Sequence, residues 1–239
     1  MPYLSVNKVL ALLIDGNFWI SSATVVLYLS AAKVFAIEQT SLAMAIFLFC
    51  GTWFVYGLHS VLTQKYYAKY NQLLIWLAMP PALIAFLFLP SKSQLAFVFP
   101  MLISVAYILP LFQNNKKLRD FPLIKIFLVA GAWTALSTTI PVFSMLSESG
   151  IQLWTFSAAR FLLIFAITLP FDIRDIQKDS ISGVKTLPMV FGVGGSKILA
   201  LVCLSSSGLL TIFHYFTGWH SGWLLIAETL SLILASVLV

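Results

Sequence analysis

Long apolar runs separated by short polar segments fill almost the whole chain. An α-helix needs about 20 apolar residues to cross a bilayer, and runs of this length occur repeatedly. The pattern predicts eight membrane spans, at residues 17–35, 40–62, 72–90, 94–111, 122–144, 151–171, 195–216 and 221–239. Long continuous runs favour helices over the short alternating strands of a barrel, so the expected fold is an all-α transmembrane bundle.

Composition supports the same class of protein. The 239 residues are 60% hydrophobic and only 9% charged, whereas soluble domains carry about 25% charged residues. We therefore expect one membrane-embedded domain covering residues 1–239 and a lipid bilayer as its surroundings. The net charge of +6 does not indicate nucleic-acid binding, because the basic residues are scattered among the segments between spans.

The distribution of Lys and Arg predicts an orientation. One set of inter-span segments holds eleven basic residues, namely Lys8, Lys65, Lys69, Lys116, Lys117, Arg119, Lys125, Arg174, Lys178, Lys185 and Lys197. The opposite set holds only Lys33 and Lys92, and Arg160 lies inside a span. Because basic segments stay on the cytoplasmic side, both termini and the segment after residue 171 are expected to be cytoplasmic.

That segment contains the most informative polar pattern in the chain. Three of the eight acidic residues lie within it, at Asp172, Asp175 and Asp179. Spacings of three and four residues place all three carboxylates on one face of a helix. Clustered carboxylates repel unless a cation lies between them, and Mg²⁺ prefers such oxygen ligands together with substrate phosphates. The alternative is a solvated charged loop between two spans.

Other cytoplasmic segments add basic and aromatic residues. Lys65, Tyr66 and Lys69 follow the second span, and Tyr107 precedes a basic stretch after the fourth span. Cations for phosphate and carboxylates for a metal, above an apolar bundle, suit an amphiphilic substrate with a diphosphate head and a hydrocarbon tail.

Two segments resemble a known family. The sequence DIRDIQKDSISGVKTLP at residues 172–188, followed by Phe191 and Gly192, resembles the second Asp-rich motif of the UbiA-type intramembrane prenyltransferases, which include 4-hydroxybenzoate polyprenyltransferase. Tyr107, Pro110 and the basic stretch after them resemble the family's Tyr-x-x-Pro and Lys/Arg segment. The likeness covers about residues 40 to 200. It implies a helical bundle, nine spans in the family, with two Asp-rich loops capping a central cavity.

The resemblance also implies an activity and its residues. The expected reaction is Mg²⁺-dependent transfer of a prenyl group from an allylic isoprenyl diphosphate to an acceptor, often aromatic, within the membrane. Asp175 and Asp179 match the metal-binding pair, with Asp172 as a third ligand. The positions that match the family's basic residues for diphosphate are Lys117, Arg119 and Lys185. Tyr107 matches the aromatic residue near the reacting carbon.

One departure from the family bears on activity. The first Asp-rich motif, Asn-Asp-x-x-Asp, should fall between Val55 and Lys69, but no Asp or Glu occurs between Glu38 and Asp120. Lys65 and Lys69 are candidates to supply positive charge to the diphosphate there. The alternative function is a catalytically degenerate relative that binds isoprenoid lipid or assists a biosynthetic partner. A transporter is less favoured, because the charges cluster at one face.

Arg160 is the exception to that clustering, since it lies inside the sixth span. A charge in this position is costly in lipid and indicates a function or a partner. Glu228 is a plausible partner, but the sequence does not place the two together. His214 and His220 are expected at the membrane interface opposite the Asp-rich segment.

Overall fold

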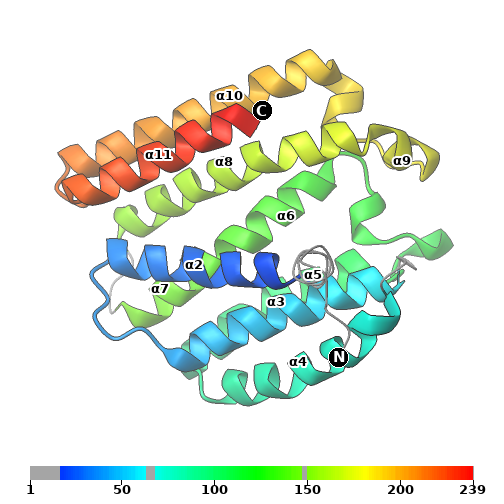
Figure 1. Ribbon diagram of the computed structural model, residues 1–239, viewed down its shortest axis with the longest axis horizontal. Helices are drawn as coiled ribbons and strands as arrows, with labels where there is room; N and C mark the ends of the chain where they lie inside the picture. Colours follow the sequence, from blue (N-terminus) through cyan, green and yellow to red (C-terminus); the bar gives the residue numbers. More distant parts are fainter. Residues whose placement is uncertain (1–16, 63–67, 147–149, 239) are drawn as a thin grey trace, which may run out of the picture. The chain divides into compact units, whose positions relative to one another are not determined.

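The computed structural model describes residues 17–62, 68–146 and 150–238, and all regular elements in these ranges are helical (Figure 1). The chain divides into two compact units, Met1–Ala96 and Phe97–Val239. Within the described ranges, five helices are long and apolar enough to cross a membrane, and three shorter apolar helices accompany them. These eight helices correspond to the eight predicted runs, which confirms the all-α, polytopic architecture.

The first unit is built from α2 (Phe18–Val34), α3 (Leu42–Leu62), α4 (Ala68–Leu87) and the start of α5 (Ser91–Ile108). Helices α3 and α4 pack closely because Gly57 of α3 lies directly against the side chain of Ile75 of α4. Helices α2 and α3 are joined by a hydrogen bond between the hydroxyls of Thr24 and Thr52, 3.2 Å apart. Small and hydroxyl-bearing residues at such contacts let helices approach where lipid offers no hydrophobic drive.

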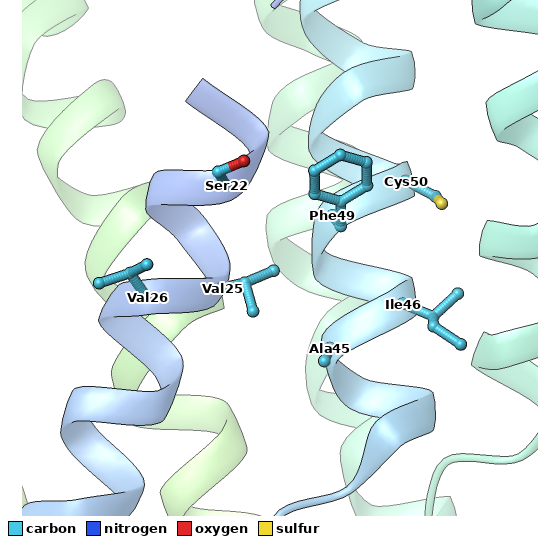
Figure 2. Close-up of a pocket in the computed structure, with 7 residues that line it drawn as sticks. All are labelled: Ser22, Val25, Val26, Ala45, Ile46, Phe49 and Cys50. Carbon is cyan, nitrogen blue, oxygen red and sulfur yellow. The ribbon is translucent and has the colours of Figure 1, made fainter. Parts of the chain in front are cut away.

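A groove of about 380 Å³ runs between α2 and α3 (Figure 2). Its lining is apolar except for one hydroxyl and one thiol, and consists of Ser22, Val25, Val26, Ala45, Ile46, Phe49 and Cys50. None of these side chains is charged, so the groove lacks the groups that a diphosphate requires. Neither Cys50 nor Cys203 forms a disulfide, in line with two thiols that lie inside apolar spans.

The second unit is organised around α8 (Ile151–Arg174), which packs against α6 (Ile124–Thr134) and α10 (Leu187–Phe216). Helix α6 continues through a π-helical segment, Ala135–Thr139, into α7 (Ile140–Met145). Helix α11 (Gly222–Leu238) runs beside α10 (Figure 1). The hydroxyl of Ser207 on α10 donates a hydrogen bond of 2.9 Å to the carbonyl oxygen of Ala159 on α8.

Two interruptions shape the end of this unit where the Asp-rich segment lies. Helix α8 ends at Arg174, and the short helix α9 (Ile176–Ile181) follows after Asp175 alone. Helix α10 is broken at Gly192, whose φ of +72° is accessible to glycine at little cost. The connection from α5 to α6 contains two 3₁₀ turns, Gln113–Asn115 and Leu118–Asp120.

Candidate functional site

The acidic segment forms the junction between α8 and α9. Asp172 lies in the last turn of α8, Asp175 stands between the helices, and Asp179 belongs to α9. The backbone N–H of Asp179 donates to the carbonyl oxygen of Asp175 at 2.9 Å, so a helical path continues through the junction. Asp172 and Asp179 are both buried, with residue exposures of 2% and 3%. Asp172 and Asp179 thus lie on two successive helices and not on one face of a single helix.

A lysine that the sequence reasoning assigned no role lies between these two carboxylates. The Nζ atom of Lys125, in the first turn of α6, is 2.8 Å from Oδ1 of Asp172 and 2.7 Å from Oδ2 of Asp179. Figure 1 shows the start of α6 close to the end of α8. One ammonium group thus donates to two buried carboxylates and offsets the charge of one of them. The sequence feature that could have indicated Lys125 is its position at the start of an apolar run. This end of the run is on the predicted cytoplasmic side, where the Asp cluster is also expected.

Asp175 has a different environment from its two neighbours. The Nε and Nη2 atoms of Arg174 donate to its two carboxylate oxygens at 3.0 and 3.2 Å. Both side chains are partly open to solvent. This bidentate contact holds the pKa of Asp175 below its usual value. Asp175 is therefore the carboxylate of the three that remains accessible from outside.

Tyr107 and Arg119, predicted from the family resemblance, lie together. The guanidinium carbon of Arg119 is 5.4 Å from the centre of the Tyr107 ring, a cation–π contact. Tyr107 also interacts electrostatically with Lys125, Asp172 and Asp179. The second unit thus brings one aromatic ring, two cations and two carboxylates into one polar cluster.

The other predicted basic residues are less closely tied to this cluster. The backbone N–H of Lys117 donates to Oδ2 of Asp120 at 2.8 Å, which fixes the turn before α6. The carbonyl oxygen of Lys185 accepts a hydrogen bond of 2.9 Å from the N–H of Leu123, so its backbone lies beside the start of α6. The Lys185 side chain is exposed. Lys65 and the side chain of Lys69 lie outside the described residues.

The carboxylates as arranged do not fit a metal ion. The ammonium of Lys125 occupies the space between Asp172 and Asp179, and Asp175 is engaged by Arg174. Among the residues that the structure describes, no three His, Cys, Asp or Glu side chains form a group that could hold a metal. The metal roles of Asp172, Asp175 and Asp179 therefore stay predictions from the sequence.

A second buried polar cluster lies in the first half of α8, distant from the Asp residues along the helix. The Nη2 atom of Arg160 is 4.0 Å from Oε1 of Glu228 on α11. The Thr211 hydroxyl donates to Oε2 of Glu228 at 3.0 Å, and Nε2 of His220 is 3.5 Å from the same oxygen. The rings of His214 and His220 are stacked and fully buried, so these histidines belong to the packed interior.

Comparison with known proteins identifies the architecture. No family model matches the sequence, nor does any curated protein sequence. Three solved structures of a UbiA homolog from Archaeoglobus fulgidus are similar: bound to DMAPP and Mg²⁺, bound to GPP and Mg²⁺, and without a stated ligand. The first two have a TM-score of 0.64 at 14% identity and cover 90% of this chain and 82% of theirs. The third has a TM-score of 0.62 at 14% identity and covers 90% of this chain and 81% of its own. The chain therefore has the fold of the UbiA homologs, across nearly its whole length.

Proposed function

We propose that this protein binds an allylic isoprenyl diphosphate at the polar cluster of its second unit and transfers the prenyl group to an acceptor in the membrane. The observation that carries the proposal is the grouping of Tyr107, Arg119 and Lys125 with buried carboxylates at one end of an apolar bundle. The solved homolog with the same fold is described as bound to DMAPP and to GPP. The polar cluster suits the diphosphate head of such a ligand, and the apolar helices suit its hydrocarbon tail.

The chemistry follows from where charge develops. The allylic C–O bond breaks, the electron pair leaves with the diphosphate, and the prenyl carbon becomes cationic. Arg119, with Lys117 and Lys185, stabilises the growing negative charge on the leaving group. The ring of Tyr107 stabilises the carbocation by cation–π attraction, worth roughly 0.5–2 kcal/mol. The acceptor then attacks the prenyl carbon and loses a proton.

No step of this scheme runs through Mg²⁺. The sequence predicts a Mg²⁺ requirement, and the homolog structures are described as bound to Mg²⁺. In this chain the expected ligands are paired with basic side chains instead. Transfer measured with Mg²⁺ and with a chelator tests whether the ion is required.

Binding is the first test, because it needs no knowledge of the acceptor. Purified protein in lipid nanodiscs is titrated with geranyl diphosphate, with geraniol and with inorganic diphosphate. Removing a charge-assisted contact costs about 1.5–3 kcal/mol, so Arg119→Ala should weaken geranyl diphosphate binding by roughly 10- to 150-fold. Lys92→Ala removes an exposed cation distant in sequence and serves as the matched control. Equal affinity for geraniol, with no effect of Arg119→Ala, would overturn the proposal.

Turnover is tested with labelled geranyl diphosphate and a lipid extract as the source of acceptors. Wild-type protein should move the label into a new lipid product and release diphosphate. The metal role that the sequence predicts for Asp175 requires Asp175→Ala to abolish this transfer, whereas Glu38→Gln, a change at an exposed carboxylate, should not affect it. Full transfer by a normally inserted Asp175→Ala variant would remove Asp175 from the site.

A specific observation favours a second function, the binding of isoprenoid diphosphate without turnover. The chain has no Asp or Glu between Glu38 and Asp120, and Lys125 satisfies the buried pair that remains. Tight, Arg119-dependent binding that is never followed by label transfer, across acceptor extracts, would support this function over catalysis.

A further inference from the structure

The protein buries two acidic residues side by side at the junction between α8 and α9. Asp172 and Asp179 both contact the same nitrogen atom, and their side chains are 3% and 4% exposed. Two buried carboxylates in contact with one point repel each other strongly unless a cation occupies that point. A metal ion or a basic side chain can supply this cation in a protein site. Here it is the ammonium group of Lys125.

The backbone around Lys125 holds the ammonium in this place. Leu123, two residues earlier, has a φ of +63°, a left-handed conformation that a leucine rarely adopts. Its N–H donates to the carbonyl oxygen of Lys185, in the segment after α9. The turn into α6 is thereby attached to the segment that follows α9, the helix that carries Asp179. Strained backbone of this kind persists where the surrounding structure requires it.

Basic side chains already offset most of the negative charge that would attract a divalent ion to Asp172 and Asp179. Three carboxylates, with Lys125 and Arg174 paired to them, give a net charge of −1. A Mg²⁺ ion between Asp172 and Asp179 would have to displace an ammonium that already donates to both. The segment where the family carries its other Asp pair contains no acidic residue. The carboxylates that the family's first Asp-rich motif would supply to a shared metal ion are therefore missing from this sequence.

We propose that the ammonium of Lys125 takes the place of a divalent cation at the Asp172/Asp179 pair. The site then presents a fixed, covalently attached cation where a metal-dependent site would present an exchangeable one. A consequence that rests on the proposed function is that an isoprenyl diphosphate binds without a metal ion bridging these two carboxylates. The affinity for the diphosphate then depends on the basic side chains of the chain itself.

Metal binding to the protein without any substrate tests the proposal directly. Mn²⁺, a paramagnetic substitute for Mg²⁺, is titrated into protein in nanodiscs of uncharged phosphatidylcholine and followed by electron paramagnetic resonance. The wild type and Asp172→Asn/Asp179→Asn should bind Mn²⁺ equally weakly, because Lys125 already occupies the position between the two carboxylates. Lys125→Met, which has similar length and no charge, frees the two carboxylates and should bind Mn²⁺ roughly tenfold or more tightly than the wild type.

Two further variants make the result specific. Lys125→Met/Asp179→Asn should lose the Mn²⁺ affinity gained by the single variant, because one of the two freed carboxylates is gone. Lys178→Met removes an exposed cation of α9, next to Asp179 in sequence, and should leave Mn²⁺ binding unchanged. The wild-type comparison with Asp172→Asn/Asp179→Asn decides the question even if Lys125→Met fails to insert.

The outcomes separate this inference from the proposed function. Stoichiometric Mn²⁺ binding by the wild type that depends on Asp172 and Asp179 would overturn the role of Lys125, whether or not the protein transfers prenyl groups. Failure of the wild type to bind geranyl diphosphate, with or without Mg²⁺, would overturn the proposed function and leave the Mn²⁺ result standing. Geranyl diphosphate binding in the presence of a chelator, weakened by Lys125→Met and restored by adding Mg²⁺, is expected if both hold.

Discussion

The ion pair between the buried Arg160 and the partly buried Glu228 gives a quantitative prediction for the stability of the second unit. Glu228→Gln keeps the shape of the side chain and its contact with Thr211 but removes the negative charge 4.0 Å from Arg160. At this separation and an effective dielectric constant of about 20, two unit charges interact by about 4 kcal/mol. The Arg160 side chain is 9% exposed and that of Glu228 is 20% exposed, so solvent screens only part of this.

The remaining contacts of Arg160 reduce the expected loss. Its guanidinium also lies 5.1 Å from the ring centre of Phe156, and this contact survives the substitution. We therefore expect Glu228→Gln to destabilise the protein by about 2–4 kcal/mol. For a chain of this size, 1 kcal/mol corresponds to a Tm change of about 2–4 °C, so the Tm should fall by roughly 4–16 °C.

Thermal unfolding in mild detergent, followed by tryptophan fluorescence, measures this shift. Glu38→Gln makes the same chemical change at an exposed position and should alter the Tm little. Arg160→Met alone leaves the partly buried Glu228 without that cation and should also destabilise the protein. Arg160→Met/Glu228→Gln removes both charges and should be more stable than either single variant. A Tm for Glu228→Gln equal to wild type, or additive losses in the double variant, would refute the reasoning.

Two further predictions concern the α3–α4 contact and the Arg174–Asp175 ion pair. Gly57→Ala should destabilise α3–α4 packing by about 1–3 kcal/mol, because its Cβ would overlap the Ile75 side chain, and Ile75→Ala should relieve part of that loss in the double variant. Arg174 lowers the pKa of Asp175, so their ion pair stabilises the fold above about pH 4 and is lost as pH falls through the lowered pKa. The pair is largely exposed and contributes at most about 1 kcal/mol, so Asp175→Asn should reduce the Tm slightly at pH 6 and progressively less as the pH falls through the lowered pKa.

The sequence predicted the architecture well because span length is fixed by the bilayer and appears directly as apolar runs. The eight predicted runs correspond to the five long and three shorter apolar helices among the described residues. It also placed Asp172, Asp175 and Asp179 in one polar segment after the sixth apolar run, and the junction between α8 and α9 lies there. Both features depend on neighbours in the chain and not on which helices later pack together.

The partners of the buried charges could not be predicted, because they depend on tertiary packing. Lys125 and Asp179 are 54 residues apart, and any of several basic residues on the predicted cytoplasmic side was an equal candidate. Glu228 was likewise only one plausible partner for Arg160. Asp175 was expected on the same face as the other two carboxylates, but the break between α8 and α9 turns it toward Arg174 and solvent.

Helix α8 carries a charged residue of each of two polar clusters, one at Arg160 and one at Asp172. Removing all charges of one cluster, and then measuring stability and geranyl diphosphate binding, tests whether that cluster serves packing or ligand binding. Arg160 and Asp172 are 12 positions apart, or roughly 18 Å along a helix, and each is neutralised by a side chain of another helix. If the Arg160 cluster only stabilises packing, the neutral double variant should regain stability and bind geranyl diphosphate like the wild type. Neutralising the other cluster, with Lys125→Met/Asp172→Asn/Asp179→Asn, should likewise limit the loss of stability but abolish tight geranyl diphosphate binding. A triple variant that binds the diphosphate normally would show that this cluster, too, serves only the fold.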